Sequence, residues 1–420
     1  MTYRNRRSFL TATAAAGTVG LAGCLSDAGN WGGTDESLPE PESADSTTDV
    51  DYPEELPGEP LETFEDVDGW VTMLDAGTLE PDDEEPYAGS QSAHLAADED
   101  AAYAGIYRTV PEGEDLSEAN LSLAVKYTGA EQLQFTLELF APNARETYTL
   151  RRTLTGPEDR WVRVDFGTTN VEGQPDLTNV REIRLTVRRR GDDGPIECWI
   201  DDLRTVERPE RGTVLLLFDG TLESHHTTAL EHLQAHDFAG VEAVIPEAVG
   251  ESGRLTIDQL DELVDAGWDV AARPRTGARY LHEFSSEEQA GLIDRTAAWL
   301  EHYGFEDGVD HFVTPRNVLS PTAADLVADT HEQAFRYGGG PNALPITDPY
   351  NLGFVSGAAG DETKMYVDHA AEYGQLAVLH FEQIGGESEG LSEDEFRSLL
   401  EHIETSDVDV VTASDLLEER

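Results

Sequence analysis

Apolar residues in the second half of the chain form short runs that alternate with amphipathic segments of helix length. The run Leu215–Phe218 is apolar at every position and is followed by Asp219 and Gly220. Such a run is typical of a parallel strand that is buried on both faces. Open α/β sheets keep their chemistry at the carboxyl ends of these strands. The pattern therefore predicts that Asp219 lies at a strand end, where it is available for chemistry.

The same alternation continues to the end of the chain. The runs that predict strands are Val214–Phe218, Val241–Ile245, Val270–Ala272, His311–Thr314, Phe335–Tyr337, Gly353–Val355, Leu376–His380 and Val408–Val411. The segments that predict helices are Ile257–Ala266, Glu287–Tyr303, Ala323–His331, Thr363–Tyr373 and Glu393–Thr405, each with Asp, Glu, Ser or Thr near its start. Repeated strand–helix units over about 200 residues predict an α/β fold, a distorted (β/α) barrel, across residues 212–420.

Between Leu61 and Pro209 the pattern has a period of two residues. Its alternating runs are Leu121–Tyr127, Leu133–Phe140, Thr147–Thr153, Trp161–Phe166 and Ile183–Arg188, and Gly, Pro, Asn and Asp separate them. This spacing predicts an antiparallel β-sandwich over residues 61–209. The chain is therefore predicted to be multidomain, with an N-terminal sandwich and a C-terminal barrel.

The first 60 residues show neither pattern. Arg6–Leu10 contains a twin-arginine pattern, Thr11–Ala22 is a short apolar stretch, and Leu21–Cys24 is similar to a lipobox. This order predicts a signal peptide over residues 1–23, lipid attachment at Cys24 and export by the twin-arginine route to the outer face of the cell membrane. The alternative is an uncleaved signal anchor. Residues 24–60 are polar and acidic and predict a flexible tether.

Charge changes this picture in one respect. The chain has 85 acidic and 28 basic residues, a formal net charge of −57, and the acids are spread along its whole length. A hydrophobic fraction of 39% still supports packed cores, so the composition indicates a folded, halophilic protein. Such a surface excludes duplex nucleic acid as a ligand. Cys198 is the only cysteine besides Cys24, and we expect it to be a buried apolar residue.

The second half resembles the polysaccharide deacetylase family, carbohydrate esterase family four. The likeness rests on the order of Leu215–Gly220, the amphipathic Thr228–His236, Val241–Ile245, the Asp265–Val270 turn and Leu376–His380. It implies a barrel of seven parallel strands and metal-assisted hydrolysis of N-acyl groups on a glycan. In the family's mechanism, Asp219 would be the general base and His380 the late acid.

The metal ligands of that family are mostly missing. Gly220 stands where a metal-binding acid is expected, and the two histidine positions fall on Arg273 and Gly277 or, in the other register, on Arg275 and Arg279. We therefore expect no transition metal at the barrel mouth. The alternative is a site rebuilt from Asp219 with His225 or His226, and His282 is a further candidate. Against it, His225 and His226 are adjacent, so only one of them can face a given ion on a helix.

Arginines gather on the same predicted loops. Arg273, Arg275 and Arg279 follow one strand, and Arg316 follows another. Guanidinium groups bind carboxylate or sulfate through paired hydrogen bonds, so one hypothesis is a pocket for an acidic glycan. The other is that these arginines are used in salt bridges with neighbouring carboxylates.

The predicted sandwich resembles jelly-roll carbohydrate-binding modules. The likeness rests on Phe64–Trp70, Gly89–Leu95 and Trp199–Leu203. It implies glycan binding and a structural calcium, for which Glu65, Asp66, Asp201 and Asp202 are the candidate ligands, with solvated carboxylates as the alternative. The candidate sugar-stacking aromatics are Trp70, Tyr87, Tyr103, Tyr107 and Trp161.

Two functions follow from these patterns. The first is a cell-surface lipoprotein that hydrolyses acyl groups on extracellular or envelope polysaccharide, with an atypical metal site. The second is a pseudoenzyme that binds glycan with a degenerate deacetylase barrel and a sandwich. The missing ligands favour the second, because Lewis-acid polarisation supplies several kcal/mol of transition-state stabilisation. A solute-binding or scaffolding lipoprotein is a more distant third.

The charge predicts how salt affects stability. Repulsion between surface carboxylates falls as the Debye length shrinks from about 10 Å at 0.1 M salt to about 3 Å at 1 M. We expect a higher thermal midpoint in molar KCl than in dilute buffer, measured by circular dichroism on the full chain. Equal midpoints in the two buffers would contradict this prediction.

Overall fold

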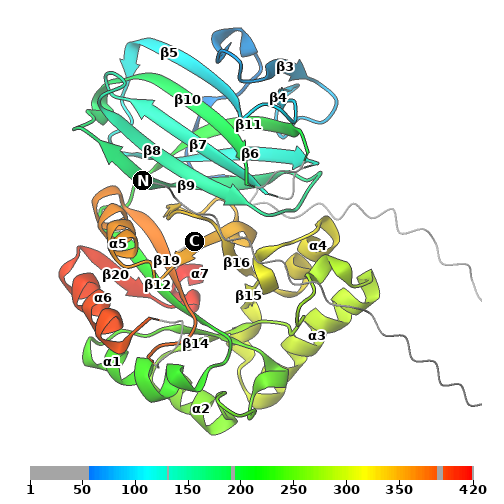
Figure 1. The fold of residues 1–420 in the computed structure, drawn as a ribbon, viewed down its shortest axis with the longest axis vertical. Coiled ribbons are helices and arrows are strands. Elements are labelled where there is room, and N and C mark those ends of the chain that lie inside the picture. Colours follow the sequence, from blue (N-terminus) through cyan, green and yellow to red (C-terminus); the bar gives the residue numbers. More distant parts are fainter. Residues whose placement is uncertain (1–55, 130–131, 191–193, 386–390, 419–420) are drawn as a thin grey trace, which may run out of the picture. The chain divides into compact units, whose positions relative to one another are not determined.

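The computed structural model describes residues 56–129, 132–190, 194–385 and 391–418. Strands β1–β11 end at Glu207 and β12 begins at Gly212, so the predicted sandwich and barrel follow one another along the chain (Figure 1). The predicted signal peptide, Cys24 and almost all of the predicted tether lie outside the described residues. Of the helices within them, none has the length and apolar content that a membrane span requires.

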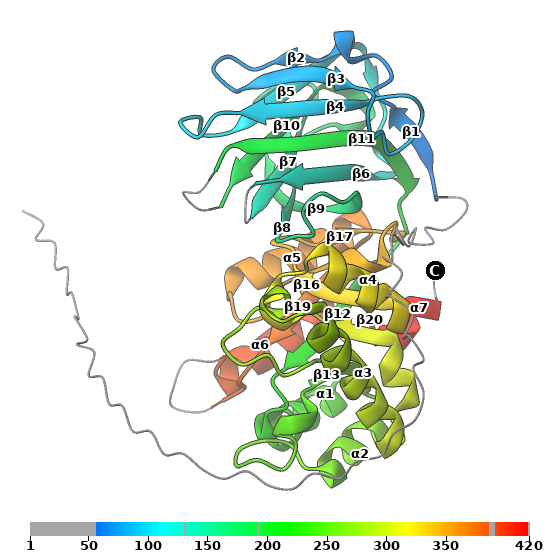
Figure 2. The same ribbon diagram turned by 90° about the vertical axis from the view of Figure 1, so that its right-hand side faces the viewer.

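The first part is an antiparallel sandwich, as the alternating pattern predicts. Its strands are β1 (Glu59–Glu62), β2 (Val71–Thr72), β3 (Thr78–Asp82), β4 (Ser92–Ala97), β5 (Ala104–Glu114), β6 (Ala119–Thr128), β7 (Leu133–Phe140), β8 (Thr147–Leu154), β9 (Val162–Glu172), β10 (Val180–Arg189) and β11 (Ile196–Glu207). They pair in the order β2-β5-β10-β7-β8-β9-β6-β11-β4-β3, with β1 on β11. Strand β9 pairs with β6 in its first half and with β8 in its second, so both layers share it (Figure 2).

Alternation along each strand divides the sandwich into a core and an outer face. In β7 every second residue from Leu133 to Leu139 enters the core, and the residues between them lie on the other face. Cys198 on β11 is also fully buried, as expected. Strand β1 includes Glu59 and Pro60, which the sequence pattern places in the tether. This short edge strand has too few apolar residues to be recognised locally.

The second part is a closed barrel. Its strands are β12 (Gly212–Asp219), β13 (Val241–Val244), β14 (Asp269–Ala272), β15 (His311–Val313), β16 (Gln333–Tyr337), β17 (Asn342–Ala343), β18 (Leu352–Ser356), β19 (Gln375–Phe381) and β20 (Val408–Val411). Seven parallel strands, β12-β13-β14-β15-β16-β18-β19, close through a pairing of β19 with β12. Strand β20 extends the sheet along the start of β12, and β17 pairs antiparallel with β19. The barrel and its strand number agree with the predicted fold class.

Helices cover the outside of the barrel (Figure 1). They are α1 (Leu230–Ala235), α2 (Ile257–Asp265), α3 (Ser286–Tyr303), α4 (Pro321–Thr330), α5 (Asp361–Tyr373) and α6 (Glu393–Thr405). Helix α7 (Ala413–Glu418) instead adds Ala413 and Leu416 to the apolar cluster inside the barrel. Thr256, Ser285 and Ser392 each accept a backbone N–H at the start of α2, α3 and α6, and a Gln or Glu three residues later completes a capping box. These local signals explain why the sequence locates the helices well.

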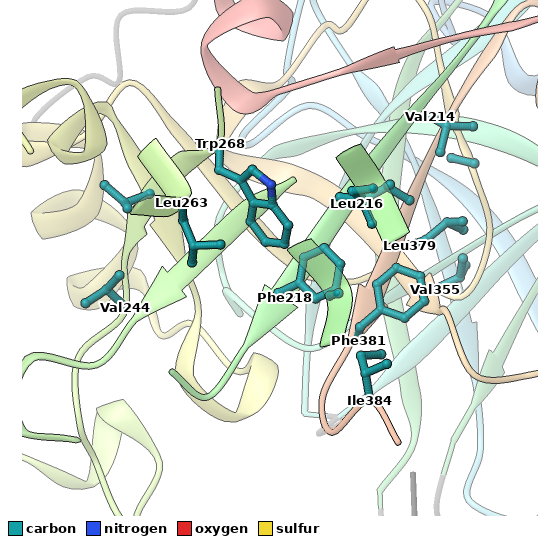
Figure 3. Packing of buried hydrophobic residues seen from close by; sticks show 14 of the residues in the cluster. Val214, Leu216, Phe218, Val244, Leu263, Trp268, Val355, Leu379, Phe381 and Ile384 are labelled. Atoms are coloured by element: carbon teal, nitrogen blue, oxygen red, sulfur yellow. The ribbon is translucent and has the colours of Figure 1, made fainter. Parts of the chain in front are cut away.

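Strand β12 shows why its residues are apolar throughout. Val214, Leu216 and Phe218 pack in the layer between strands and helices, whereas Leu215 and Leu217 belong to the cluster inside the barrel. Figure 3 shows the outer layer, where the Phe218 ring lies 4.8 Å from that of Trp268 and 5.1 Å from that of Phe381. Both faces of β12 are therefore buried, as in other parallel strands.

Three arginines are buried where the sandwich contacts the barrel: Arg152 on β8, Arg163 on β9 and Arg336 on β16. Arg152 donates to Asn342 Oδ1 at 2.8 Å. Arg152 and Arg336 also donate to Asn351 Oδ1, at 3.1 and 2.7 Å. The Asn351 amide in turn donates to the backbone oxygen of Arg163 at 2.6 Å. One barrel side chain thus joins strands of both parts.

Three buried acids supply the compensating charge at this interface. Asp202 forms an ion pair with Arg163 at 2.8 Å, and Asp348 accepts the Arg163 backbone N–H at 3.0 Å. Asp165 accepts the backbone N–H of Thr347 at 2.9 Å. Burial raises the pKa of both Asp165 and Asp348 despite these hydrogen bonds. The sandwich and the barrel form one compact unit through this polar interface.

The buried Arg163–Asp202 pair gives a stability prediction. The two side chains are 0% and 7% exposed, so Arg163→Met leaves a buried carboxylate with less compensation. We expect a loss of about 3–5 kcal/mol in the free energy of unfolding, measured by urea denaturation at constant molar KCl. Arg211→Met is the matched control, because the Arg211 side chain is 49% exposed and its ion pairs are with surface acids. Its cost should stay below about 1 kcal/mol, and equal costs for the two variants would contradict the prediction.

Candidate functional site

Three predicted site residues meet at the carboxyl ends of the barrel strands. Asp219 ends β12, and its position follows the inward-facing Leu215 and Leu217. His380, near the end of β19, likewise follows residues that face inward. Its Nε2 lies 3.4 Å from Asp219 Oδ2, and its ring stacks on that of Phe354 at 4.3 Å. The structure therefore brings the predicted base and acid together at the mouth of the barrel.

Arg273 is the third member of this group. It directly follows β14, and its guanidinium forms an ion pair with Asp219 Oδ1. The two side chains are 18% and 12% exposed, so the pair is largely shielded from water. Arg273 is also one of the positions at which the family resemblance places a metal-binding histidine. The positively charged Arg273 side chain thus contacts the Asp219 carboxylate at the mouth of the barrel.

This pairing sets the chemistry of Asp219. Burial alone would raise the pKa of its carboxyl group, but the Arg273 charge and the His380 hydrogen bond outweigh burial and lower that pKa. A carboxylate with a lowered pKa is a weaker base, whereas a general base works best with a pKa near the operating pH.

The residues at the mouth do not fit a metal. A guanidinium is a donor without a lone pair to offer, so Arg273 cannot act as a ligand. Across the described ranges, no group of three or more His, Cys, Asp or Glu side chains has the arrangement of a metal site. Gly220, at the position of the family's metal-binding acid, adopts φ of +107° and lies in the turn that follows β12. No catalytic step through a metal can be built from this arrangement.

His225 lies on the other side of the β-sheet from Asp219. Its Nδ1 is 2.7 Å from Glu242 Oε2, and its Nε2 is 3.0 Å from the backbone oxygen of Glu382. Burial would lower the pKa of His225, but Glu242 raises it above its usual value. Glu242 is on β13 between the inward-facing Val241 and Ala243, so the pair sits in the outer layer. Both ring nitrogens of His225 are occupied.

His226 and His282 are also engaged elsewhere. The His226 Nε2 lies 2.6 Å from Glu262 on α2, and the His282 ring stacks on Tyr280 at 5.5 Å. The hypothesis of a metal site rebuilt from Asp219 with His225 or His226 therefore has no support in this geometry, because the two histidines form separate pairs with separate acids. Glu242, the buried partner of His225, was not identified from the sequence, although an acid inside an apolar strand is a recognisable signal.

The four arginines predicted to bind an acidic glycan do not gather in one pocket. Arg273 pairs with Asp219, and Arg275 forms an ion pair with Glu251 at 2.9 Å. Arg279 lies over the ring of Phe284 at 3.7 Å, and Arg316 lies over that of Tyr280 at 4.8 Å. The structure thus favours the salt-bridge interpretation for Arg273 and Arg275. It leaves Arg279 and Arg316 on surface aromatic rings.

The four acids considered as calcium ligands each have another partner. Glu65 accepts the backbone N–H of Ser90 at 2.7 Å, and Asp66 accepts the backbone N–H of Asp68 at 2.8 Å. Asp201 accepts the backbone N–H groups of Tyr87 and Ala88, both at 3.0 Å. Asp202 forms ion pairs with Arg163 and Arg204. These hydrogen bonds fix turns and strand ends. They do not form a common cage of oxygen ligands, so the geometry gives the calcium hypothesis no support.

The candidate stacking aromatics also contact other side chains. Trp70 is buried and stacks on Phe64 at 5.6 Å. Tyr87 and Trp161 contact each other at 5.7 Å, and Arg188 lies over Tyr103 at 4.5 Å. Tyr107 on β5 is half-buried. No bare aromatic platform is formed by this set.

A groove of about 450 Å³ crosses the outer face of β7, β8, β9 and β10. Its lining is mostly polar: Gln134, Thr136, Glu138, Phe140, Ala144, Thr147, Thr149, Arg151, Asn170, Glu172, Arg184, Thr186 and Arg188. The sequence analysis did not identify this groove. The alternation in Ile183–Arg188 places its arginines opposite the core, but only the pairing of four strands shows that the polar faces adjoin.

Comparison with known proteins gives matches of fold at low identity. No protein-family model matches the chain, and no curated protein matches it by sequence. The Xyl-CE4 domain of a multidomain xylanase from the hindgut metagenome of Trinervitermes trinervoides is 15% identical, with a TM-score of 0.37 over 50% of this chain and 91% of that chain.

Two further solved structures are similar to parts of the chain. The family 11 carbohydrate-binding module of the cellulase Lic26A-Cel5E of Clostridium thermocellum is 14% identical, with a TM-score of 0.28 over 36% of this chain and 96% of that chain. An exo-β-agarase is 15% identical, with a TM-score of 0.29 over 36% of this chain and 25% of its own. The neighbours thus include both groups that the sequence resembles, the family 4 carbohydrate esterases and the carbohydrate-binding modules.

The Asp219–Arg273 pair predicts a pH-dependent stability difference. Asp219→Asn keeps the side-chain shape but leaves a largely buried arginine without its counterion, at a cost of about 3 kcal/mol at pH 7. Because the pKa of Asp219 is lowered by folding, the pair is fully stabilising above the ordinary Asp pKa and is lost as pH falls through the lowered value. The gap between parent and variant should therefore begin to narrow as pH falls to about 4 and should close only below the lowered pKa of Asp219.

Urea denaturation at constant KCl from pH 7 to pH 2 measures this gap. Glu251→Gln is the control, because its ion pair with Arg275 is exposed to solvent and should contribute little to stability. A gap that stays constant over the whole pH range, or an equal cost for the control, would show that Asp219 is not stabilised by Arg273.

Proposed function

We propose that this chain is a non-catalytic glycan-binding protein in which a deacetylase-like barrel supports a carbohydrate-binding sandwich. The observation that carries the proposal is the ion pair between Arg273 and Asp219. This ion pair holds a permanent positive charge beside Asp219, the carboxylate that hydrolysis would need as a base. We further propose, from the sequence motifs alone, that lipid at Cys24 holds the protein on the outer face of the cell membrane.

The energetic argument concerns transition-state stabilisation. Acyl hydrolysis in a metal-dependent barrel draws several kcal/mol from polarisation of the carbonyl and activation of water. The mouth of this barrel offers an ion-paired carboxylate, a histidine stacked on Phe354 and no further acid or histidine in a metal-binding arrangement with them. Nothing in this arrangement of described residues replaces the missing polarisation.

The binding role is supported by the groove on the sandwich. Its threonine hydroxyls and its Asn and Gln amides can both donate and accept hydrogen bonds, as sugar hydroxyls do. Its volume of about 450 Å³ lies in the range of pockets that bind small ligands. The groove is built on paired strands, so its side chains are held in a fixed order along four backbones.

A second candidate function is hydrolysis by the Asp219–His380 pair. The 3.4 Å separation of these side chains favours it, as does a hollow of about 260 Å³ beside His380 lined by Ser356, Ala358, Phe381, Glu382, Gln383, Ile384 and Leu391. In that case Asp219 would have to be released from Arg273 when substrate binds.

One experiment separates the two functions. The full chain in molar KCl is titrated with a panel of soluble polysaccharides by affinity electrophoresis, and acetate release from acetylated chito-oligosaccharides is measured with and without added Zn²⁺ or Co²⁺. We expect binding of at least one polysaccharide and no acetate release. Acetate release by the parent that is lost in both Asp219→Asn and His380→Ala would establish the hydrolase instead.

The groove is tested in the same binding assay. Thr186→Trp places a large ring among the groove-lining side chains of β10 and should abolish binding. Thr78→Trp on β3 is the control, because Thr78 is exposed and lies outside the groove. Unchanged binding by Thr186→Trp would move the glycan site away from the groove.

A further inference from the structure

The groove on the sandwich carries an unusual local charge. Three arginines line it, Arg151, Arg184 and Arg188, against two acids, Glu138 and Glu172. The whole chain has three times as many acidic as basic residues. A cationic groove on so acidic a protein is therefore a local departure from its general surface, and it comes from three positions on two strands.

The three guanidinium groups differ in how they are held. The Nε of Arg151 and that of Arg184 are buried and have no hydrogen-bond partner among the described residues. Arg184 lies over the ring of Phe140 at 4.5 Å and forms ion pairs with Glu182 at 3.2 Å and with Glu138 at 3.6 Å. Arg188 lies over the ring of Tyr103 at 4.5 Å. The ring beneath Arg188 fixes the plane of its guanidinium and leaves its N–H edge for a ligand, whereas the edge of Arg184 already contacts two carboxylates.

We infer that this groove binds an anionic oligosaccharide whose carboxylate or sulfate groups are held by Arg151 and Arg188. The inference rests on the proposed glycan-binding function and specifies its substrate class. Arginine presents a planar fork of donors that matches the two oxygens of a carboxylate or sulfate. The threonine hydroxyls between the arginines match the uncharged part of a sugar chain.

High salt would allow an anionic ligand to bind this groove although the protein as a whole is strongly acidic. A protein of net charge −57 repels an anionic ligand at long range. At molar salt the Debye length is about 3 Å, so the distant carboxylates are screened while direct hydrogen-bonded contacts in the groove remain. The local arginines can therefore decide the selectivity under the conditions in which the fold is stable.

The acidic-glycan site is thus placed on the sandwich and not on the barrel loops. Arg273 and Arg275 already have carboxylate partners, whereas the described part of the chain offers Arg151 no ion pair. Two neighbouring residues of β8 lie on opposite faces of the sheet. Arg151 lines the groove, whereas Arg152 is buried against Asn342 of the barrel.

The test is calorimetry on the full chain in 1 M KCl. The ligands are a tetramer of galacturonic acid, the neutral galactose tetramer and a sulfated galactose tetramer. We expect the parent to bind an anionic tetramer at least about tenfold more tightly than the neutral one, because hydrogen bonds to charged groups are the stronger kind. Preference for only one of the two anions would identify carboxylate or sulfate as the group recognised, and either result supports the inference.

Variants assign the preference to the groove. Arg151→Ala and Arg188→Ala should each reduce affinity for the preferred anionic tetramer about tenfold and leave any binding of the neutral tetramer unchanged. Arg211→Ala, on the barrel surface, is the matched control and should change neither. Thermal midpoints confirm that each variant is folded, and Arg188, which is exposed, provides a second test if Arg151→Ala does not fold.

The remaining outcomes separate this inference from the proposed function. Equal affinity of the parent for neutral and anionic tetramers would overturn the anionic specificity and leave glycan binding intact. Binding of no tetramer and of no polysaccharide in the panel would overturn both. An anionic preference that survives in Arg151→Ala and in Arg188→Ala would also overturn the assignment to this groove.

Discussion

The fold depends on a buried polar contact between the sandwich and the barrel. Arg152, Arg163 and Arg336 are almost completely inaccessible to water, and each has hydrogen-bond partners across the interface or a buried acid nearby. Charges at such depth are tolerated when they are paired or when most of their donors have hydrogen-bond partners. The requirement fixes the segment from Asn342 to Asn351 against β8 and β9, and it therefore also fixes the strands that form the groove.

The barrel mouth shows a related use of charge. A guanidinium contacts Asp219 at the point where a metal-dependent enzyme of this fold needs an uncharged ligand, and the carboxylate is held in its ionised form. On the outer side of the same strands, Glu242 and His225 form a second buried pair. Both pairs stabilise the barrel without supplying a metal site. Under the proposed function, the barrel would serve as a scaffold.

In this interpretation the sandwich binds the glycan and the barrel supports it. Because the rest of the surface is acidic, a few arginines are enough to distinguish the binding groove. Arg273 and Arg275 on the barrel loops pair with carboxylates, whereas no ion pair is found for Arg151 or Arg188 of the groove within the described ranges. Selectivity for an anion would then arise from a few positions on β8 and β10. The remainder of the surface would serve solubility in salt.

The sequence by itself determined the secondary structure and the ends of the strands. Period-two alternation, all-apolar runs and helix caps are local signals, so they located the sandwich, the barrel strands and the positions of Asp219 and His380. They missed the two-residue β17 and the edge strand β1, which carry almost no such signal, and they gave no element for β2, β3, β5 and α7. Only the tertiary structure decided which charges meet, because closure of the barrel and pairing of distant strands select the partner of each arginine. The partner of Arg273, the burial of Arg152 and the solvent-facing position of Arg151 all depend on that choice.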